Sequence, residues 1–484
     1  MYCHKPGENR GVVSIRKNRY DLASAGHALR WPAACAAMAA VMLLPAIWNG
    51  FPFVFADTGG YLIRPFMGTL ELGRSALYGA FLAAGIPLDF WPCVIVQALL
   101  CAWLVSLVLR TQGLTRPATA FVVVVAMCIC TSLPWYAGQL MPDVFMPLAT
   151  LATYLIAFAT PQLRRSEIAA LVAIVAFAIA VHMSILAVLL VLFISFAVLR
   201  FVAPSTSPLR PRLDLPAAGI AAGVALALFS NYLIAGAATF TPGGVNFLFA
   251  RLLQDGLVET YLDRNCPSPG LTLCSYRGEK LPDENDEWLW DGDSPLRALG
   301  GWRAFAPQAG RIVLGSIEQQ PLANIRAAAI DSYGQLISVA TGDGFDDTQN
   351  WHTEWVIRTY APQAAPPFLA DRQQHNAINF DLINKWLQVP LALGATLLLP
   401  VLVLLCWRRH PRAAALVLTA FVAVAANATV CATFSGINDR YQSRIVSIAV
   451  LAAALAAYEL VQSRRRDTLP AAIPLSAAEP GQGL

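Results

Sequence analysis

The stretch IAALVAIVAFAIAVHMSILAVLLVLFISFAVL, residues 168–199, determines how this chain is folded. Its 32 residues contain one ionisable side chain, His182. A helix crosses the apolar core of a bilayer in about 20 residues, so the stretch is too long for one crossing and short for two. If it turns at His182-Met183-Ser184 and crosses twice, the basic residues that flank every apolar segment fall on one side of the membrane. The sequence therefore predicts a hairpin of two short helices.

Eight further segments are apolar enough to cross. They are Trp31–Asn49, Trp91–Leu109, Pro117–Trp135, Val144–Thr160, Leu215–Ala237, Val389–Trp407, Ala413–Phe434 and Ile445–Leu460. On the side that holds both termini, 19 Lys and Arg flank these segments, against four in the short loops of the other side. The apolar segments predict an all-α polytopic protein of the bacterial inner membrane with about ten transmembrane helices. The excess of Lys and Arg on one side predicts that both termini are cytoplasmic.

The composition supports this interpretation. Of the 484 residues, 57% are hydrophobic and 13% are charged, whereas a soluble domain has about 25% charged residues. A large soluble enzyme, a disordered chain and a nucleic-acid-binding protein are therefore excluded as classes. The net charge of +4 adds no argument for a nucleic acid partner.

The chain divides by charge and hydropathy into five parts. We expect a cytoplasmic tail at 1–30, a first transmembrane part at 31–239 with an outer loop at 50–90, an extracytoplasmic loop domain at 240–388, three spans at 389–462 and a second tail at 463–484. The loop domain of about 150 residues carries 18 Asp and Glu and 11 Lys and Arg. Within it, Cys266 and Cys274 are close enough in sequence to form a local disulfide in an oxidising periplasm.

The first outer loop carries the most unusual carboxylate. Asp57 directly follows the apolar run Phe51–Ala56, so it is expected at membrane depth, where a charge is costly unless it is used or paired. An ion pair with Arg64 or Arg74 that only fixes the loop is the alternative. Residues Ser75–Leu88 are apolar but too short to span, which predicts a helix lying in the outer interface.

Two further outer loops carry charges. Asp143 follows Pro142 and precedes a span, so it either caps that helix or faces a cavity. Arg440 and Arg444 are four residues apart and share one helix face, where they either clamp a phosphate or extend to the membrane surface. His182 either has a structural role or faces the same compartment as Asp57 and Arg440. The acidic clusters at 283–287 and 343–347 lack the spacing of a calcium loop and are predicted to be solvated.

No metal motif, glycine-rich phosphate loop or nucleophile elbow occurs in the sequence. No cofactor is therefore expected, and no motif supports a divalent cation. The charged loops lie on the outer face, where nucleotide sugars and ATP are absent. An activated donor used there would have to be carried by a lipid.

These features together resemble the GT-C superfamily of polytopic membrane glycosyltransferases. The resemblance rests on Asp57 with Tyr61, on Pro142-Asp143, on the hairpin and on Asp439-Arg440-Tyr441, and it covers roughly residues 31–200 and 388–462. It implies a polyprenyl-phosphate sugar as donor and an envelope lipid, polysaccharide or protein as acceptor.

The resemblance also implies roles for single residues. Asp57 would be the general base of an inverting transfer, and Asp143 would position it or the acceptor. Arg440 and Arg444, with Arg74 and His182, would hold the donor phosphate. The remaining residues expected to position the substrate are Tyr61, Arg64 and Tyr441.

Two other classes remain open. A transporter or flippase would need charges at the middle of the bilayer and paired broken helices. The ionisable residues are instead concentrated near one face, which favours chemistry at the surface. A non-catalytic envelope assembly protein would use the acidic loop to bind partners.

Overall fold

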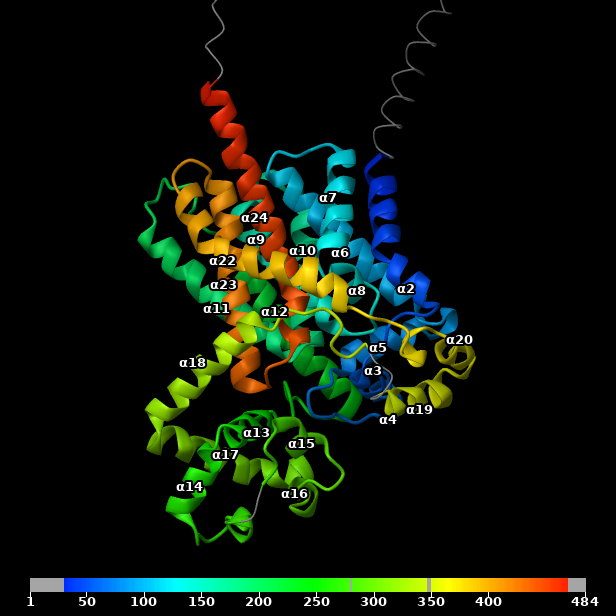
Figure 1. Cartoon of the computed structure of the whole chain (residues 1–484), viewed down its shortest axis with the longest axis vertical. Helices are drawn as coiled ribbons and strands as arrows, with labels where there is room; N and C mark the ends of the chain where they lie inside the picture. Colours follow the sequence, from blue (N-terminus) through cyan, green and yellow to red (C-terminus); the bar gives the residue numbers. More distant parts are fainter. Residues whose placement is uncertain (1–29, 279–280, 346–349, 469–484) are drawn as a thin grey trace, which may run out of the picture.

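The computed structural model of the chain describes residues 30–278, 281–345 and 350–468 (Figure 1). Throughout these residues the regular structure is helical, apart from two isolated bridges, Phe53 with Gln139 and Glu71 with Arg74. The predicted tails lie largely outside the described residues. Where the second tail was expected to begin, the last helix continues to Thr468.

Six of the described helices are long and apolar enough to cross a membrane. They are α6 (Trp91–Thr111), α11 (Met183–Val202), α12 (Asp214–Ala235), α22 (Val389–Cys406, continuous with a turn from Asp381), α23 (Pro411–Phe434) and α24 (Asp439–Thr468). The fold is thus that of a multi-pass helical membrane protein. The count of ten spans stays a prediction.

Shorter apolar helices fill the remaining predicted segments. They are a helix at residues 30–42 continued by α2 (Leu44–Asn49), then α7 (Pro117–Cys130), α9 (Phe145–Phe158) and α10 (Arg165–Val181). The predicted interfacial helix is α5 (Ala76–Gly85), capped by Ser75 and extended by a 3-10 turn to Leu88. Most of α9 is buried, and it lies among α6, α10, α23 and α24. It therefore forms the centre of the apolar core.

The 168–199 stretch breaks where the sequence indicates. His182 has an extended backbone, with φ −146° and ψ 119°, and it ends α10 and begins α11. The two arms pack on different neighbours, α10 against α9 and α12 and α11 against α23. This separation holds the His182 turn between the helices that carry the other polar groups.

The 240–388 segment divides into two parts. Helices α13 (Val245–Gln254), α14 (Leu257–Asn265), α15 (Asn285–Trp290), α16 (Pro295–Ala298) and α17 (Gly301–Gln319) form a module with its own apolar core. A disulfide joins Cys266 to Cys274 at its edge. Helix α18 (Pro321–Ile337) then returns to the transmembrane body and packs against α23 (Figure 1).

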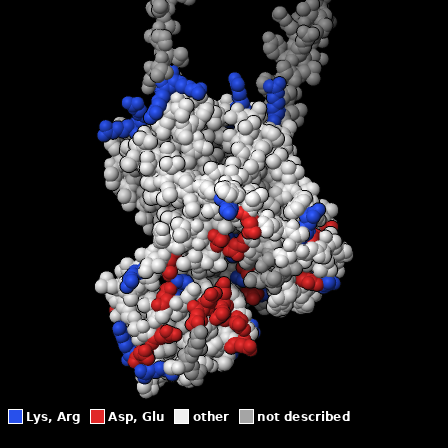
Figure 2. All heavy atoms as spheres, viewed as in Figure 1, with Lys and Arg blue, Asp and Glu red and all other residues white. Residues whose placement is uncertain are grey.

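The second part of this segment covers the first outer loop. Helix α19 (Trp351–Tyr360) packs on α3 (Ala56–Leu62), the helix that carries Asp57. Helix α20 (Ala365–Leu369) follows it. Charge is separated along the molecule: basic side chains gather at the end where both termini leave, and acidic ones gather on the α13–α17 module and its boundary with the body (Figure 2).

Candidate functional site

The first two outer loops are joined by backbone contacts. Phe53 N donates to Gly138 O at 3.0 Å, and Leu140 N donates to Phe53 O at 2.8 Å. Gln373, which is fully buried, bonds both the N–H and the C=O of Val54 at 3.0 and 2.8 Å. These bonds fix the start of α3 against the loop that carries Asp143, and so determine where Asp57 points.

Asp57 pairs with Arg74, the ion pair that the sequence leaves open as an alternative. The two side chains keep 19% and 14% of their surface exposed, so the carboxylate can still be reached. Arg74 also lies 5.1 Å from the ring centre of Trp290 in the α13–α17 module. Tyr61 is buried behind this pair, with its hydroxyl 3.5 Å from Gly73 O.

Arg64 does not reach these groups. Its guanidinium bonds Gly60 O at 2.9 Å and pairs with Glu71 at 2.8 Å, both within the first outer loop. It is 7% exposed. Its observed contacts are therefore those of a residue that holds the loop together.

Asp143 and Arg444 form a buried ion pair at 2.8 Å, with 0% and 1% of the side chains exposed. The same guanidinium lies 3.2 Å from His182 Nε2 and 3.2 Å from Ser184 Oγ, and it also contacts Asn427 Oδ1 at 3.3 Å. Because a guanidinium can only donate, His182 Nε2 accepts this bond. His182 and Arg444 are thus occupied with each other, and no helix cap by the Asp143 side chain is found.

Arg440 is held differently. Its guanidinium carbon lies 3.8 Å from the ring centre of Phe55 and 5.2 Å from that of Tyr441. Its Nε is 4.0 Å from Asp143, and its Nη1 is buried without a hydrogen-bond partner among the described residues. A buried donor that is left unpaired is costly. Arg440 therefore keeps capacity to bind an additional anionic group.

Acidic side chains of the large loop border this network. Asp343 accepts a bond from Arg440 N at 3.0 Å, so the prediction of a solvated loop is wrong at this residue. Burial and the nearby charge of Asp57 raise the pKa of Asp286 in α15. Both residues bring negative charge to the site from segments distant in sequence.

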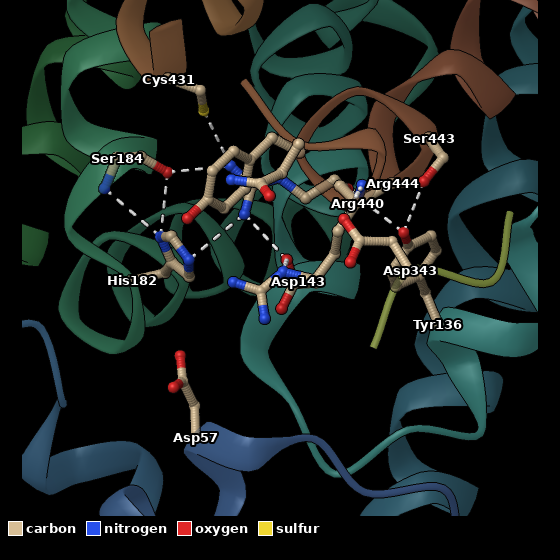
Figure 3. A network of polar contacts seen from close by, with 12 residues as sticks. Asp57, Tyr136, Asp143, His182, Ser184, Asp343, Cys431, Arg440, Ser443 and Arg444 are labelled. Carbon is tan, nitrogen blue, oxygen red and sulfur yellow. Dashed lines mark hydrogen bonds and ion pairs between the residues drawn. The ribbon is translucent and has the colours of Figure 1, made fainter. Parts of the chain in front are cut away.

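The structure brings together Asp57, Asp143, His182, Arg440 and Arg444 from four separate segments. Figure 3 shows the last four in one network, with Asp57 pointing toward them from α3. The partners that sequence reasoning missed include Ser184, Asn427, Cys431 and Asp343. A signal existed for Asn427, because an amide side chain is unexpected in the apolar segment Ala413–Phe434.

A small cavity adjoins the ion pair of Asp57 and Arg74. A cavity of about 30 Å³ lies beside Arg74, lined also by Ser75, Met183 and Asn231. This is room for a water or two, whereas a bound sugar needs several hundred Å³.

Within the described residues, no three His, Cys, Asp or Glu side chains are grouped so that they could hold a metal ion. Comparisons with protein-family models, with curated proteins and with solved structures found no match. The partly exposed carboxylate of Asp57 faces a buried guanidinium with an unpaired donor. Such a pair can accept a proton on one side and hold an anion on the other.

Proposed function

We propose that this protein is an integral membrane glycosyltransferase that moves a sugar from a polyprenyl-phosphate-linked donor to an envelope acceptor. The observation that supports it most is the juxtaposition of Asp57 with Arg440. An accessible carboxylate and a buried, partly unpaired guanidinium face each other near one end of a transmembrane body. Glycosyl transfer with a phosphate leaving group needs these two functions.

In this mechanism the acceptor hydroxyl gives its proton to the Asp57 carboxylate as its oxygen attacks the anomeric carbon. The bond from that carbon to the phosphate oxygen breaks, and the configuration inverts. Arg440 stabilises the charge that grows on the departing polyprenyl phosphate. Arg74 holds Asp57 until the acceptor arrives.

Arg444 and His182 take a positioning role in this proposal. Both Nη atoms of Arg444 are hydrogen-bonded, to Asp143, His182, Ser184 and Asn427, and its buried Nε has no partner among the described residues. Arg444 therefore holds the carboxylate of Asp143 in place near Arg440. This differs from the role as phosphate ligands that the family resemblance implies for Arg444 and His182. Tyr441 would orient Arg440 through the contact of its ring.

The proposal includes a topology. The chain crosses the bacterial inner membrane about ten times, with both termini cytoplasmic and with the site and the 240–388 segment periplasmic. It is supported by the separation of charge between the two ends of the molecule. A single cysteine placed at Asp293, which is exposed, should react with an impermeant reagent from the periplasmic side. Reaction from the cytoplasmic side alone would overturn the topology.

The enzymatic proposal is tested with Asp57→Asn. A strain lacking the protein is complemented with the wild type or the variant, and lipid-linked sugars and envelope glycans are measured by mass spectrometry. The variant should fail to restore the missing glycan while reaching the membrane at normal levels. Asp263→Asn is the matched control, because it removes a carboxylate paired with an arginine at the surface of the α13–α17 module. Normal glycan with Asp57→Asn would refute the catalytic role.

A further inference from the structure

A second site lies at the opposite end of the transmembrane body. A groove of about 550 Å³ opens between the turn that joins α22 to α23 and the end of α24. Its basic and aromatic lining consists of Trp407, Arg408, Arg409, His410 and Arg464. Figure 2 shows the basic side chains gathered at this end of the molecule, far from the acidic module.

The groove also has an apolar wall. Leu404 and Leu405 line it and are 78% and 56% exposed, and Leu460 lies on its other side. Exposed leucines at the end of a spanning helix face the acyl chains of the bilayer. The groove is therefore open both to the headgroup layer and to the hydrocarbon.

Its electrostatics favour an anion. The long helix α23 begins at Pro411, directly after the groove residue His410, so the positive end of its dipole lies at the groove. Arg408 and Arg409 are exposed at its edge. The acidic group beside it is Glu459, which is 3.7 Å from His410 Nδ1 and 32% exposed. Among the side chains that the structure describes at the groove, basic groups outnumber this carboxylate.

We propose that this groove binds an anionic phospholipid, with the phosphate held by the basic side chains and one acyl chain against Leu404 and Leu405. Basic pockets at the cytoplasmic ends of spanning helices suit such headgroups, and a volume of several hundred Å³ is typical of ligand pockets. A free phosphate would contact only the basic side chains, whereas the acyl chain of a lipid also packs against the apolar wall. The inference rests on the proposed topology and is independent of the proposed transferase activity.

The test uses the full-length protein purified in a neutral detergent and measured by native mass spectrometry. Phosphatidylglycerol is the probe, with phosphatidylcholine of the same acyl chains and soluble glycerol phosphate as comparisons. The double variant Arg408→Ala/Arg409→Ala should bind phosphatidylglycerol about 30-fold more weakly, which follows from about 1 kcal/mol for each arginine near an anionic surface.

The matched control is Arg164→Ala/Arg165→Ala, an adjacent exposed pair at the start of α10 that is not part of the groove. It should retain tight binding of phosphatidylglycerol. Equal weakening in both double variants would indicate a diffuse charge effect and overturn the site. Binding of phosphatidylcholine as tight as that of phosphatidylglycerol would also overturn the site. So would displacement of phosphatidylglycerol by glycerol phosphate at equal concentration.

Discussion

The strongest quantitative prediction concerns Asp143→Asn. The change preserves the shape of the side chain but removes a negative charge that faces Arg444 Nη1 at 2.8 Å and Arg440 Nε at 4.0 Å. All three side chains are at most 7% exposed, so water cannot replace the lost charge. Leaving one member of a buried ion pair unpaired costs about 3–5 kcal/mol. The lower figure corresponds to a more than 100-fold larger ratio of unfolded to folded protein.

The assay compares purified variants in one detergent, with unfolding by added denaturant followed through tryptophan fluorescence. Asp57→Asn is the internal comparison: its ion pair with Arg74 is partly exposed, so its loss should cost about 1 kcal/mol or less. A double-mutant cycle with Arg444→Gln should give a clear coupling energy between the two positions. If Asp143→Asn unfolds at the same denaturant concentration as the wild type, the buried network does not hold the site together and the reasoning fails.

Three further predictions follow from the described residues. Replacing Cys266 and Cys274 by Ser opens a loop of nine residues, which should cost about 2–3 kcal/mol and speed proteolysis within the α13–α17 module. Gly344→Ala would place a methyl group against the ring of Phe55, well inside van der Waals contact, at a backbone φ of +75°, so transfer activity should fall while membrane insertion persists. Burial raises the pKa of Asp371 to about 7, so the folded protein binds more protons than the unfolded chain between about pH 4 and pH 7. Its free energy of unfolding should therefore fall as the pH rises through that range. In Asp371→Asn this fall, measured by denaturant unfolding at several pH values, should disappear.

The helical framework could be predicted from the sequence because apolar length is a local property. The break at His182 is an example: a 32-residue apolar stretch is too long for one crossing, and the structure turns at that residue. The short helix after Ser75 was likewise indicated by an apolar run too short to span, and its position in the membrane interface stays a prediction. Neither inference needed knowledge of distant contacts.

The site was predictable only in part, because pairing depends on which loops meet. The sequence offers Arg64 and Arg74 as partners of Asp57, and only the packing of the loop selects Arg74. The large segment at 240–388 was expected as one domain, yet its second part packs on α3 through Thr353, which accepts a bond from Gly59 N at 2.9 Å. Contacts that join residues about 300 positions apart leave no pattern in a single sequence.

The two arginines of α24 illustrate why spacing alone does not assign a role. Arg440 and Arg444 share a helix face, as their separation of four residues requires. Burial of a guanidinium costs desolvation free energy, which it must recover through contacts with other groups. Arg444 recovers most of this cost through the hydrogen bonds of its two Nη atoms to Asp143, His182, Ser184 and Asn427, and only its Nε is buried without a partner among the described residues. Arg440 recovers only part, through ring contacts and a longer approach to Asp143, and its Nη1 stays unpaired. An anion bound at Arg440 would satisfy that donor, so the arginine that contributes less to the stability of the empty protein is the one fitted to hold a phosphate.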